Sequence, residues 1–257
     1  MSNLKQFSLE GKIAIVTGAS RGIGKATALA FASVGADLIL TSRKVNDLEK
    51  VAEQVRQEGR RALVLSAHLG NMEDISKVAN TAKAAFGRID ILVNNAGTSP
   101  VFASFLESDE RLWDTIMNLN LKGLYFLSQA VSRVMKEQGG GNIINVASVD
   151  AFMPEADNGI YCISKAGVVM ATKVMARELA PYNIRVNTLA PGYVHTKLLD
   201  GSFEVKPGRA EECRKMVPMG RIAEPGDMTG TMIYLASDAS AYMTGHTAIV
   251  DGGLLTI

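Results

Sequence analysis

The chain has 257 residues, 47% of them hydrophobic and 21% charged, a composition typical of a globular protein with a sizeable core. Its 27 Lys and Arg nearly balance 26 Asp and Glu, which argues against a dedicated nucleic-acid binder. The apolar stretches are too short for a membrane span, the N-terminus lacks a secretory signal, and the two cysteines fit no metal-ligand spacing. We therefore expect a cytoplasmic protein with no membrane, nucleic-acid or metal partner.

Short β-branched runs alternate with longer helical patterns along the whole chain. The strand-like runs cover residues 13–17, 38–41, 62–66, 89–94, 142–147, 184–189 and 248–251. The helical patterns between them cover 24–33, 46–58, 74–86, 113–136, 161–179 and 225–237. This alternation predicts one α/β domain over 1–257, a doubly wound Rossmann-type fold with about seven parallel strands and helices on both faces. Ligands of such sheets bind beyond the carboxyl ends of the strands.

A glycine-rich loop, TGASRGIG at 17–24, follows the first predicted strand and opens a helix. Glycines let a pyrophosphate approach the backbone, and the helix N-terminus supplies free N–H groups. The G-x-x-x-G-x-G spacing differs from the common dinucleotide fingerprint, and an ordinary strand–helix turn is the alternative. The residues expected to contact a dinucleotide are Gly18, Ser20, Arg21, Gly22, Ile23 and Gly24.

Further motifs follow this loop in a characteristic order. They are Asn94-Asn95-Ala96-Gly97, Asn120-x-x-Gly123, Ser148, Tyr161-x-x-x-Lys165, Pro191-Gly192 and Asp251-Gly252-Gly253. Together with the glycine loop, they resemble the short-chain dehydrogenase/reductase family over essentially the whole chain. The resemblance implies a nicotinamide-dependent oxidoreductase.

Tyr161 and Lys165 lie four residues apart, so a helix places both side chains on one face. A nearby ammonium favours a phenolate, and we expect Lys165, with an oxidised nicotinamide, to lower the tyrosine pKa from its usual value near 10. Ser148 at a strand end suits a developing oxyanion. The resemblance implies that Tyr161 is the general acid/base, that Ser148 orients the carbonyl and that Lys165 holds the ribose. It also selects Asn120, rather than Asn118, as the residue that supports a helix irregularity.

The second predicted strand ends in Thr41-Ser42-Arg43-Lys44 and carries no acid there. An acid at this place binds a free ribose 2′-hydroxyl, whereas a guanidinium binds a 2′-phosphate. Ser42 and Arg43, with Arg21 on the same side, therefore favour NADP(H) over NAD(H). The alternative is a solvated loop that touches no cofactor.

The resemblance implies further cofactor contacts. Asn95, Ala96 and Gly97 lie near the adenosine, and Pro191, Gly192, Val194 and Thr196 lie near the nicotinamide. The adenine contact departs from the family pattern, because His68, followed by Leu69, stands where an Asp is usual.

Residues 193–219 contain several Gly and Pro and predict a mobile lid on the substrate side. We expect hydride transfer between NADP(H) and a small ketone or aldehyde, as in a carbonyl reductase. A 3-oxoacyl-[acyl-carrier-protein] reductase, with Lys122, Arg133 and Lys136 as a docking patch, is one alternative. An NAD-dependent alcohol or sugar dehydrogenase and a non-catalytic NADP sensor are the others. The resemblance also implies a homotetramer.

Overall fold

A computed structural model describes residues 3–205 and 208–256 of the chain. Seven parallel strands form one sheet in the order β3-β2-β1-β4-β5-β6-β7. Their bounds are β1 (Ile13–Thr17), β2 (Asp37–Ser42), β3 (Ala62–Ser66), β4 (Ile91–Asn94), β5 (Gly141–Val146), β6 (Ile184–Pro191) and β7 (Thr247–Val250). The order reverses between β1 and β4, so their carboxyl ends flank the crevice where such sheets bind ligands.

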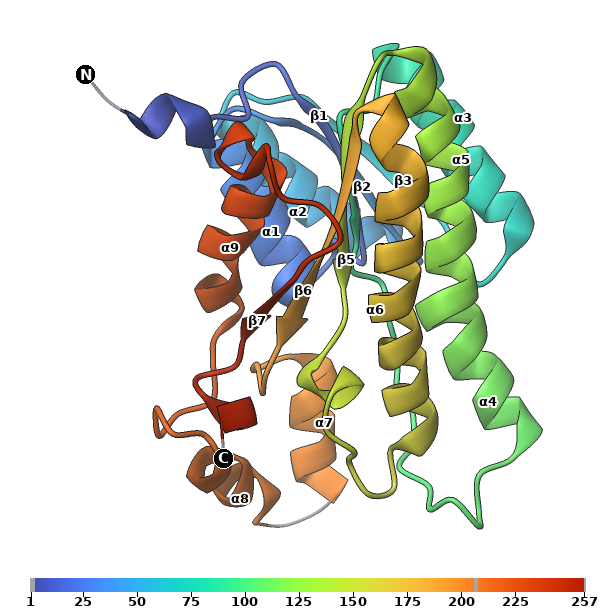
Figure 1. Cartoon of the computed structure of the whole chain (residues 1–257), viewed down its shortest axis with the longest axis vertical. Helices are drawn as coiled ribbons and strands as arrows, with labels where there is room; N and C mark the ends of the chain where they lie inside the picture. Colours follow the sequence, from blue (N-terminus) through green and yellow to red (C-terminus); the bar gives the residue numbers. More distant parts are fainter. Residues whose placement is uncertain (1–2, 206–207, 257) are drawn as a thin grey trace.

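Helices cover both faces of the sheet (Figure 1). On one face, α1 (Gly22–Ser33), α2 (Val45–Gln57) and α9 (Thr229–Ala236) bury apolar side chains against the strands. On the other, α3 (Met72–Phe86), α5 (Leu124–Glu137) and α6 (Gly159–Leu179) do the same. Sandwiched strands must be apolar on both faces, which explains why their sequences run continuously apolar instead of alternating. The predicted doubly wound fold is confirmed.

Several shorter elements complete the chain. The remaining α-helices are α4 (Glu110–Met117), α7 (Lys197–Val205) and α8 (Arg209–Met216), and Asn118–Gly123 forms the π-helical turn η2. The short 3₁₀ helices are η1 (Asn3–Phe7), η3 (Val149–Ala151), η4 (Ala180–Tyr182), η5 (Pro225–Met228), η6 (Asp238–Ser240) and η7 (Leu254–Thr256). In Figure 1, α7 and α8 lie beyond the carboxyl ends of β6 and β7.

The predicted helix over 113–136 is interrupted in the structure. It consists of α4, the π-helical turn η2 and α5 in succession. Gly123, at the end of η2, lies directly against the backbone carbonyl of Leu69, where a side chain would not fit. This close approach is a contact between distant segments, which the apolar periodicity of one segment does not show. The periodicity alone therefore predicted one unbroken helix. π-Helical turns of this kind are frequent at functional sites.

Helix α6 is the one described element that is long and apolar enough, by length and composition, to cross a membrane. Half of the apolar stretch from Gly159 to Tyr182 is nevertheless buried inside the fold, and α6 packs against β6. Burial against a sheet is typical of the core helix of a globular protein. We therefore assign α6 to the core.

Candidate active site

Ser148 lies just past the end of β5, and Tyr161 and Lys165 lie in the first turns of α6. The Ser148 hydroxyl caps η3 by accepting a hydrogen bond of 3.1 Å from the backbone N–H of Asp150. The same hydroxyl lies near the Tyr161 hydroxyl and the Asp150 carboxyl, where it partly opposes the rise in the pKa of each group. The strand end and the helix start therefore bring the three predicted residues together.

The environment of Tyr161 stabilises the neutral phenol. Its side chain is only 8% exposed, and this burial raises the pKa of the hydroxyl above its ordinary value. The nearby Asp150 carboxyl raises the pKa further, and the Ser148 hydroxyl opposes the shift only in part. Among the protein's own groups, desolvation of the phenolate therefore dominates the tyrosine pKa, and a lowering by Lys165 together with an oxidised nicotinamide stays a prediction.

Lys165 is buried beside Tyr161. Its ammonium donates a hydrogen bond of 2.9 Å to the carbonyl of Val146 and lies 5.5 Å from the centre of the Tyr161 ring. Burial lowers the pKa of Lys165 to about 8. The side chain is thus held in a fixed position between β5 and α6, with its charge sensitive to pH near neutrality.

Asn120 is buried in η2, and its amide makes three hydrogen bonds. Its Oδ1 accepts a bond of 2.8 Å from the N–H of Thr98, and its Nδ2 donates to the Thr98 carbonyl (2.9 Å) and to the Ser164 hydroxyl (3.2 Å). A methyl group on Gly97 would lie 3.4 Å from Asn120 Oδ1 and 3.5 Å from Lys165 Nζ. Asn120 therefore ties the β4–α4 loop to α6 beside Lys165.

The glycine loop has the geometry of a phosphate cradle. Gly18 and Gly22 have φ of +64° and +55°, which L side chains rarely adopt. The N-terminus of α1 begins at Gly22 and directs its free N–H groups toward the crevice. A Cβ on Gly22 would lie 3.3 Å from Thr196, so Gly22 and the segment after β6 face each other closely. The loop can hold a pyrophosphate against the helix N-terminus.

Asn94 and Asn95 join the central strands. Asn94 donates to Ser128 Oγ (2.8 Å) and to Asn145 Oδ1 (2.9 Å), which fixes β4 between α5 and β5. Asn95 donates through its side chain to the Thr17 carbonyl at 2.9 Å. The backbone N–H groups of Asn95 and Ala96 both donate to Thr17 Oγ1 at 2.9 Å. These bonds close the edge of the crevice between β1 and β4.

Two exposed arginines lie at the end of the crevice predicted to bind the adenosine. Arg43 follows β2, and Arg21 precedes α1. Within residues 3–205 and 208–256, neither guanidinium forms an ion pair with an acid. Ser42 continues this strand end, and no carboxylate occupies 41–44. The site thus offers cationic groups where a 2′-phosphate would lie.

His68 follows β3 and is exposed. Its Nδ1 accepts a hydrogen bond of 3.2 Å from the N–H of Gly70, and its own backbone N–H donates to the Asp74 carboxylate at 2.7 Å. Leu69 beside it is buried. One ring nitrogen of His68 therefore stabilises the turn, and the Nε2 atom is left to contact a base.

The loop after β6 reaches back over the crevice. Gly192 lies against the backbone of Asp251, where a Cβ would meet Asp251 Cα at 2.8 Å. Val194 is buried and forms a parallel bridge with Ala223. This bridge fixes the start of the 193–219 segment, which contains the helices α7 and α8. That the segment is a mobile lid stays a prediction. Residues 206 and 207 of this segment lie outside the described residues.

A polar network that the sequence analysis missed connects three segments on the substrate side. Arg209, at the start of α8, forms an ion pair with Glu155 and donates from Nε to Ser202 Oγ at 3.1 Å. Asn158 donates to Glu155 Oε2 and accepts from Ser99, each at 2.8 Å. The sequence shows a group of acids before Tyr161, but it does not show which cation pairs with them. Arg209 lies 54 residues away from Glu155, and only the fold brings the two together.

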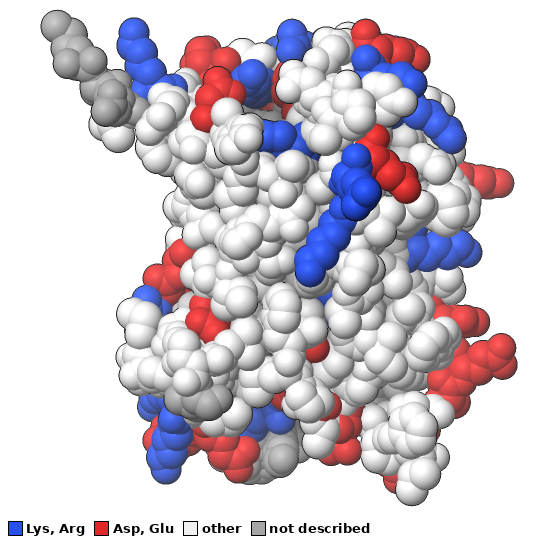
Figure 2. All heavy atoms as spheres, viewed as in Figure 1, with Lys and Arg blue, Asp and Glu red and all other residues white. Residues whose placement is uncertain are grey.

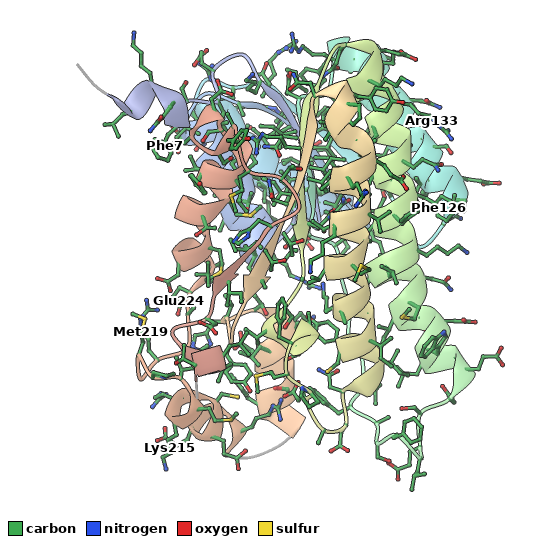
Figure 3. The ribbon with its side chains drawn as sticks, in the orientation of Figure 1. Phe7, Phe126, Arg133, Lys215, Met219 and Glu224 are labelled. Atoms are coloured by element: carbon green, nitrogen blue, oxygen red, sulfur yellow. The ribbon has the colours of Figure 1, made fainter. Side chains whose placement is uncertain are left out.

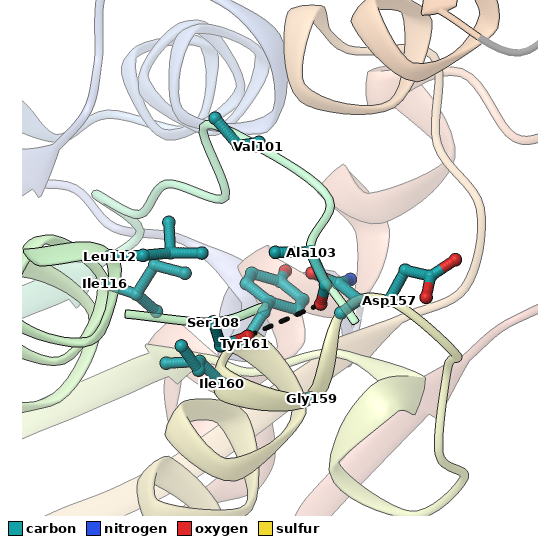
Figure 4. Close-up of a pocket in the computed structure, with 10 residues that line it drawn as sticks. Val101, Ala103, Ser108, Leu112, Ile116, Asp157, Gly159, Ile160 and Tyr161 are labelled. Atoms are coloured by element: carbon teal, nitrogen blue, oxygen red, sulfur yellow. Dashed lines mark hydrogen bonds between the residues drawn. The ribbon is translucent and has the colours of Figure 1, made fainter. Parts of the chain in front are cut away.

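A small pocket opens beside Tyr161, between the segment around residues 101–116 and the start of α6 (Figure 4). Its lining combines apolar side chains with the polar groups of Ser108, Asp157, Asn158 and Tyr161. The lining residues are Val101, Ala103, Ser108, Leu112, Ile116, Asp157, Asn158, Gly159, Ile160 and Tyr161. Met216, which ends α8, and Met219 are exposed, and Met219 lies at the outer edge of the molecule (Figure 3).

Comparisons with known proteins agree with this site. A family model described as "Enoyl-(Acyl carrier protein) reductase" matches residues 18–255. The chain is 42% identical to a 2-dehydro-3-deoxy-D-gluconate 5-dehydrogenase of Escherichia coli, with 98% of each chain covered. It is 38% identical to an NAD-dependent glycerol dehydrogenase of Listeria innocua, covering 97% of this chain and 96% of that protein.

The fold is also similar to solved structures. A gluconate 5-dehydrogenase from Burkholderia cenocepacia, in complex with NADP and tartrate, superposes with a TM-score of 0.94 at 34% identity, with both chains fully covered. Sequence, fold and the arrangement of Ser148, Tyr161 and Lys165 all lead to one assignment. The chain belongs to the short-chain dehydrogenase/reductase family and is an NAD(P)-dependent oxidoreductase that interconverts carbonyls and alcohols.

Proposed function

We propose that this enzyme transfers hydride between NADP(H) and a small ketone or aldehyde, with Ser148, Tyr161 and Lys165 as its catalytic residues. The observation that carries the proposal is their convergence at the carboxyl edge of the sheet, opposite the glycine loop. The proposed site also includes Asn120, which supports Lys165 through the β4–α4 loop.

When bound, the reduced nicotinamide supplies the hydride that adds to the carbonyl carbon. Ser148 donates a hydrogen bond to the carbonyl oxygen as negative charge develops on it. The Tyr161 hydroxyl donates its proton to that oxygen, and the same groups act in the opposite sense on an alcohol. Burial keeps Tyr161 protonated and ready to donate, and Lys165 stabilises the phenolate that the donation leaves.

The cofactor preference follows from charge. The cationic side chains of Arg21 and Arg43 suit a 2′-phosphate. No acid stands at 41–44, so nothing there repels a 2′-phosphate, and the usual hydrogen-bond acceptor for a 2′-hydroxyl is missing. The solved gluconate 5-dehydrogenase holds NADP, whereas the similar glycerol dehydrogenase is NAD-dependent. The two arginines therefore support NADP(H) for this chain. His68 and Leu69 border the adenine in this proposal.

Of the docking patch expected for an acyl carrier protein, only Lys122, in η2, lies near the site. Helix α5 runs away from the site toward the start of β5, so Arg133 and Lys136 in its last turns lie at the amino ends of the strands. Figure 3 shows Arg133 at the end of the molecule opposite to Lys215, which lies on the substrate side. Since a helix rises about 1.5 Å per residue, Arg133 is roughly 20 Å beyond Asn120. A small free substrate is therefore favoured over a carrier-bound one.

The exposed apolar residues support a homotetramer. Figure 2 shows few charged side chains over the middle of one face, where Figure 1 places α6 and β7. Large exposed hydrophobic residues there include Ile163, Met170 and Val174 on α6 and Ile249 on β7. Extended uncharged surfaces of this kind mark subunit interfaces. Light scattering on the purified protein measures the number of subunits and so tests the assembly.

The two free cysteines, Cys162 and Cys213, fit the reducing environment of the cytoplasm, which is the proposed location.

The decisive experiment is Tyr161→Phe, which removes only the proton donor. We expect turnover of every carbonyl to fall by at least about a hundredfold, which is the typical contribution of general acid catalysis, while NADPH binding persists. Tyr182→Phe is the matched control, because Tyr182 is exposed in η4, just after α6, and the substitution removes the same hydroxyl. Normal turnover in the Tyr161 variant would contradict the assigned role.

A further inference from the structure

Asp150 is a mostly buried acid two residues beyond Ser148, in η3. Its backbone N–H donates to Ser148 Oγ at 3.1 Å, which holds the residue against Ser148, and its carboxyl is close enough for its charge to act on Tyr161. The fold therefore places a carboxyl beside the two groups that are proposed to hold the carbonyl oxygen.

The surrounding charged groups are engaged elsewhere. Glu155 pairs with Arg209 and accepts from Asn158, and the Lys165 ammonium donates to the Val146 carbonyl. Over residues 3–205 and 208–256, Asp150 takes part in no ion pair. A buried carboxyl next to the reacting atoms is thus free to accept a hydrogen bond from a ligand.

We propose that Asp150 determines substrate specificity by accepting a hydrogen bond from a substrate hydroxyl on the carbon next to the reacting carbonyl. The oxygens of a hydroxyketone are about as far apart as the two ends of a hydrogen bond. An oxygen held by Ser148 therefore brings its neighbouring hydroxyl to the carboxyl adjacent to Ser148. The inference rests on the proposed function, and it names the class of substrate: α-hydroxy carbonyl compounds and the vicinal diols they form.

The same carboxyl acts against other substrates. An ethyl group in place of the hydroxymethyl group leaves the buried carboxyl without its partner, which a polar site penalises strongly. A carboxylate attached to the reacting carbon meets like charge from the Asp150 carboxylate. A 2-oxo acid should therefore be a poor substrate, whereas a negative charge farther along the chain escapes this repulsion.

The test uses isosteric pairs of carbonyl compounds with the full-length enzyme and NADPH or NADH. Hydroxyacetone is compared with 2-butanone, and 2-hydroxyacetophenone with propiophenone, so that each pair differs only by OH against CH₃. We expect kcat/KM to favour the hydroxyl member of a pair by about tenfold or more, as for a hydrogen bond to a charged group. In Asp150→Leu, this preference should fall to about one or reverse, whereas Asp150→Asn should retain part of it.

Asp114→Asn is the control, since Asp114 is an exposed acid of α4 that does not line the pocket beside Tyr161. It should leave the hydroxyl preference unchanged. Two results would overturn the role of Asp150 without contradicting the proposed function. One is a wild-type enzyme that reduces both members of each pair equally, and the other is a hydroxyl preference that persists in Asp150→Leu. An enzyme that reduces no member of either pair with either nicotinamide would instead contradict the proposed function.

Discussion

Replacing Asp150 with Asn should stabilise the folded protein at neutral and alkaline pH. Burial, with a contribution from Glu155, raises the pKa of Asp150 from 3.8 to about 7, although Ser148, Lys165 and Arg209 oppose the shift. The folded protein therefore binds more protons than the unfolded chain between these two values, and wild-type stability falls as pH rises through this window. At about 1.4 kcal/mol per tenfold change in an equilibrium constant, the full penalty above pH 7 is roughly 4 kcal/mol.

Asn cannot ionise, so the variant escapes this penalty. Urea denaturation at pH 5 and pH 8 measures the free energy of unfolding of both proteins. The advantage of Asp150→Asn over the wild type should grow by about 2.5 kcal/mol between these pH values, with relaxation of the fold reducing this figure. The exposed Asp157→Asn variant should show almost no pH-dependent difference. An equal advantage at both pH values would refute the burial of an ionisable Asp150.

Three further variants test other parts of the site. Arg43→Ala should raise the Kd of NADPH about tenfold to a hundredfold in a fluorescence titration and leave that of NADH nearly unchanged, because only NADPH carries the 2′-phosphate; an equal loss for both cofactors would contradict this. Asn120→Ala removes three hydrogen bonds and should lower the free energy of unfolding by about 3 kcal/mol, whereas Asn118→Ala should change it much less. Glu155→Gln leaves the Arg209 guanidinium without its acid and should destabilise the enzyme by about 3 kcal/mol at pH 7; an unchanged urea midpoint would count against the ion pair.

The fold could be predicted from the sequence because its signals are local. Continuous apolar strands alternate with helices, and Gly35, Gly59 and Gly87 mark helix ends with the positive φ that only glycine adopts easily. The catalytic motif was equally local, since Ser148 is fixed by a strand end and Tyr161 and Lys165 by one helix face. Each of these residues needs only its own element to be placed correctly.

Other features depend on contacts between distant segments. The π-helical turn η2 forms where Gly123 meets the backbone of Leu69, and no periodicity in α4 or α5 shows that contact. The sequence led us to expect a lowered Tyr161 pKa from Lys165 together with an oxidised nicotinamide. Among the protein's own groups burial raises this pKa, and burial is a property of the whole packed site.

Glu155 and Asp150 show why residue type alone does not reveal function. Both are acids of the β5–α6 loop, and the sequence gives no reason to separate them. Tertiary structure supplies Glu155 with Arg209 from α8, so its charge is neutralised and the pair connects the loop to the 193–219 segment. Asp150 receives no such cation in the described part of the chain, yet it lies beside Ser148. A buried charge needs a partner. Glu155 has one in Arg209 and therefore stabilises the fold, whereas we propose that Asp150 finds its partner in the substrate.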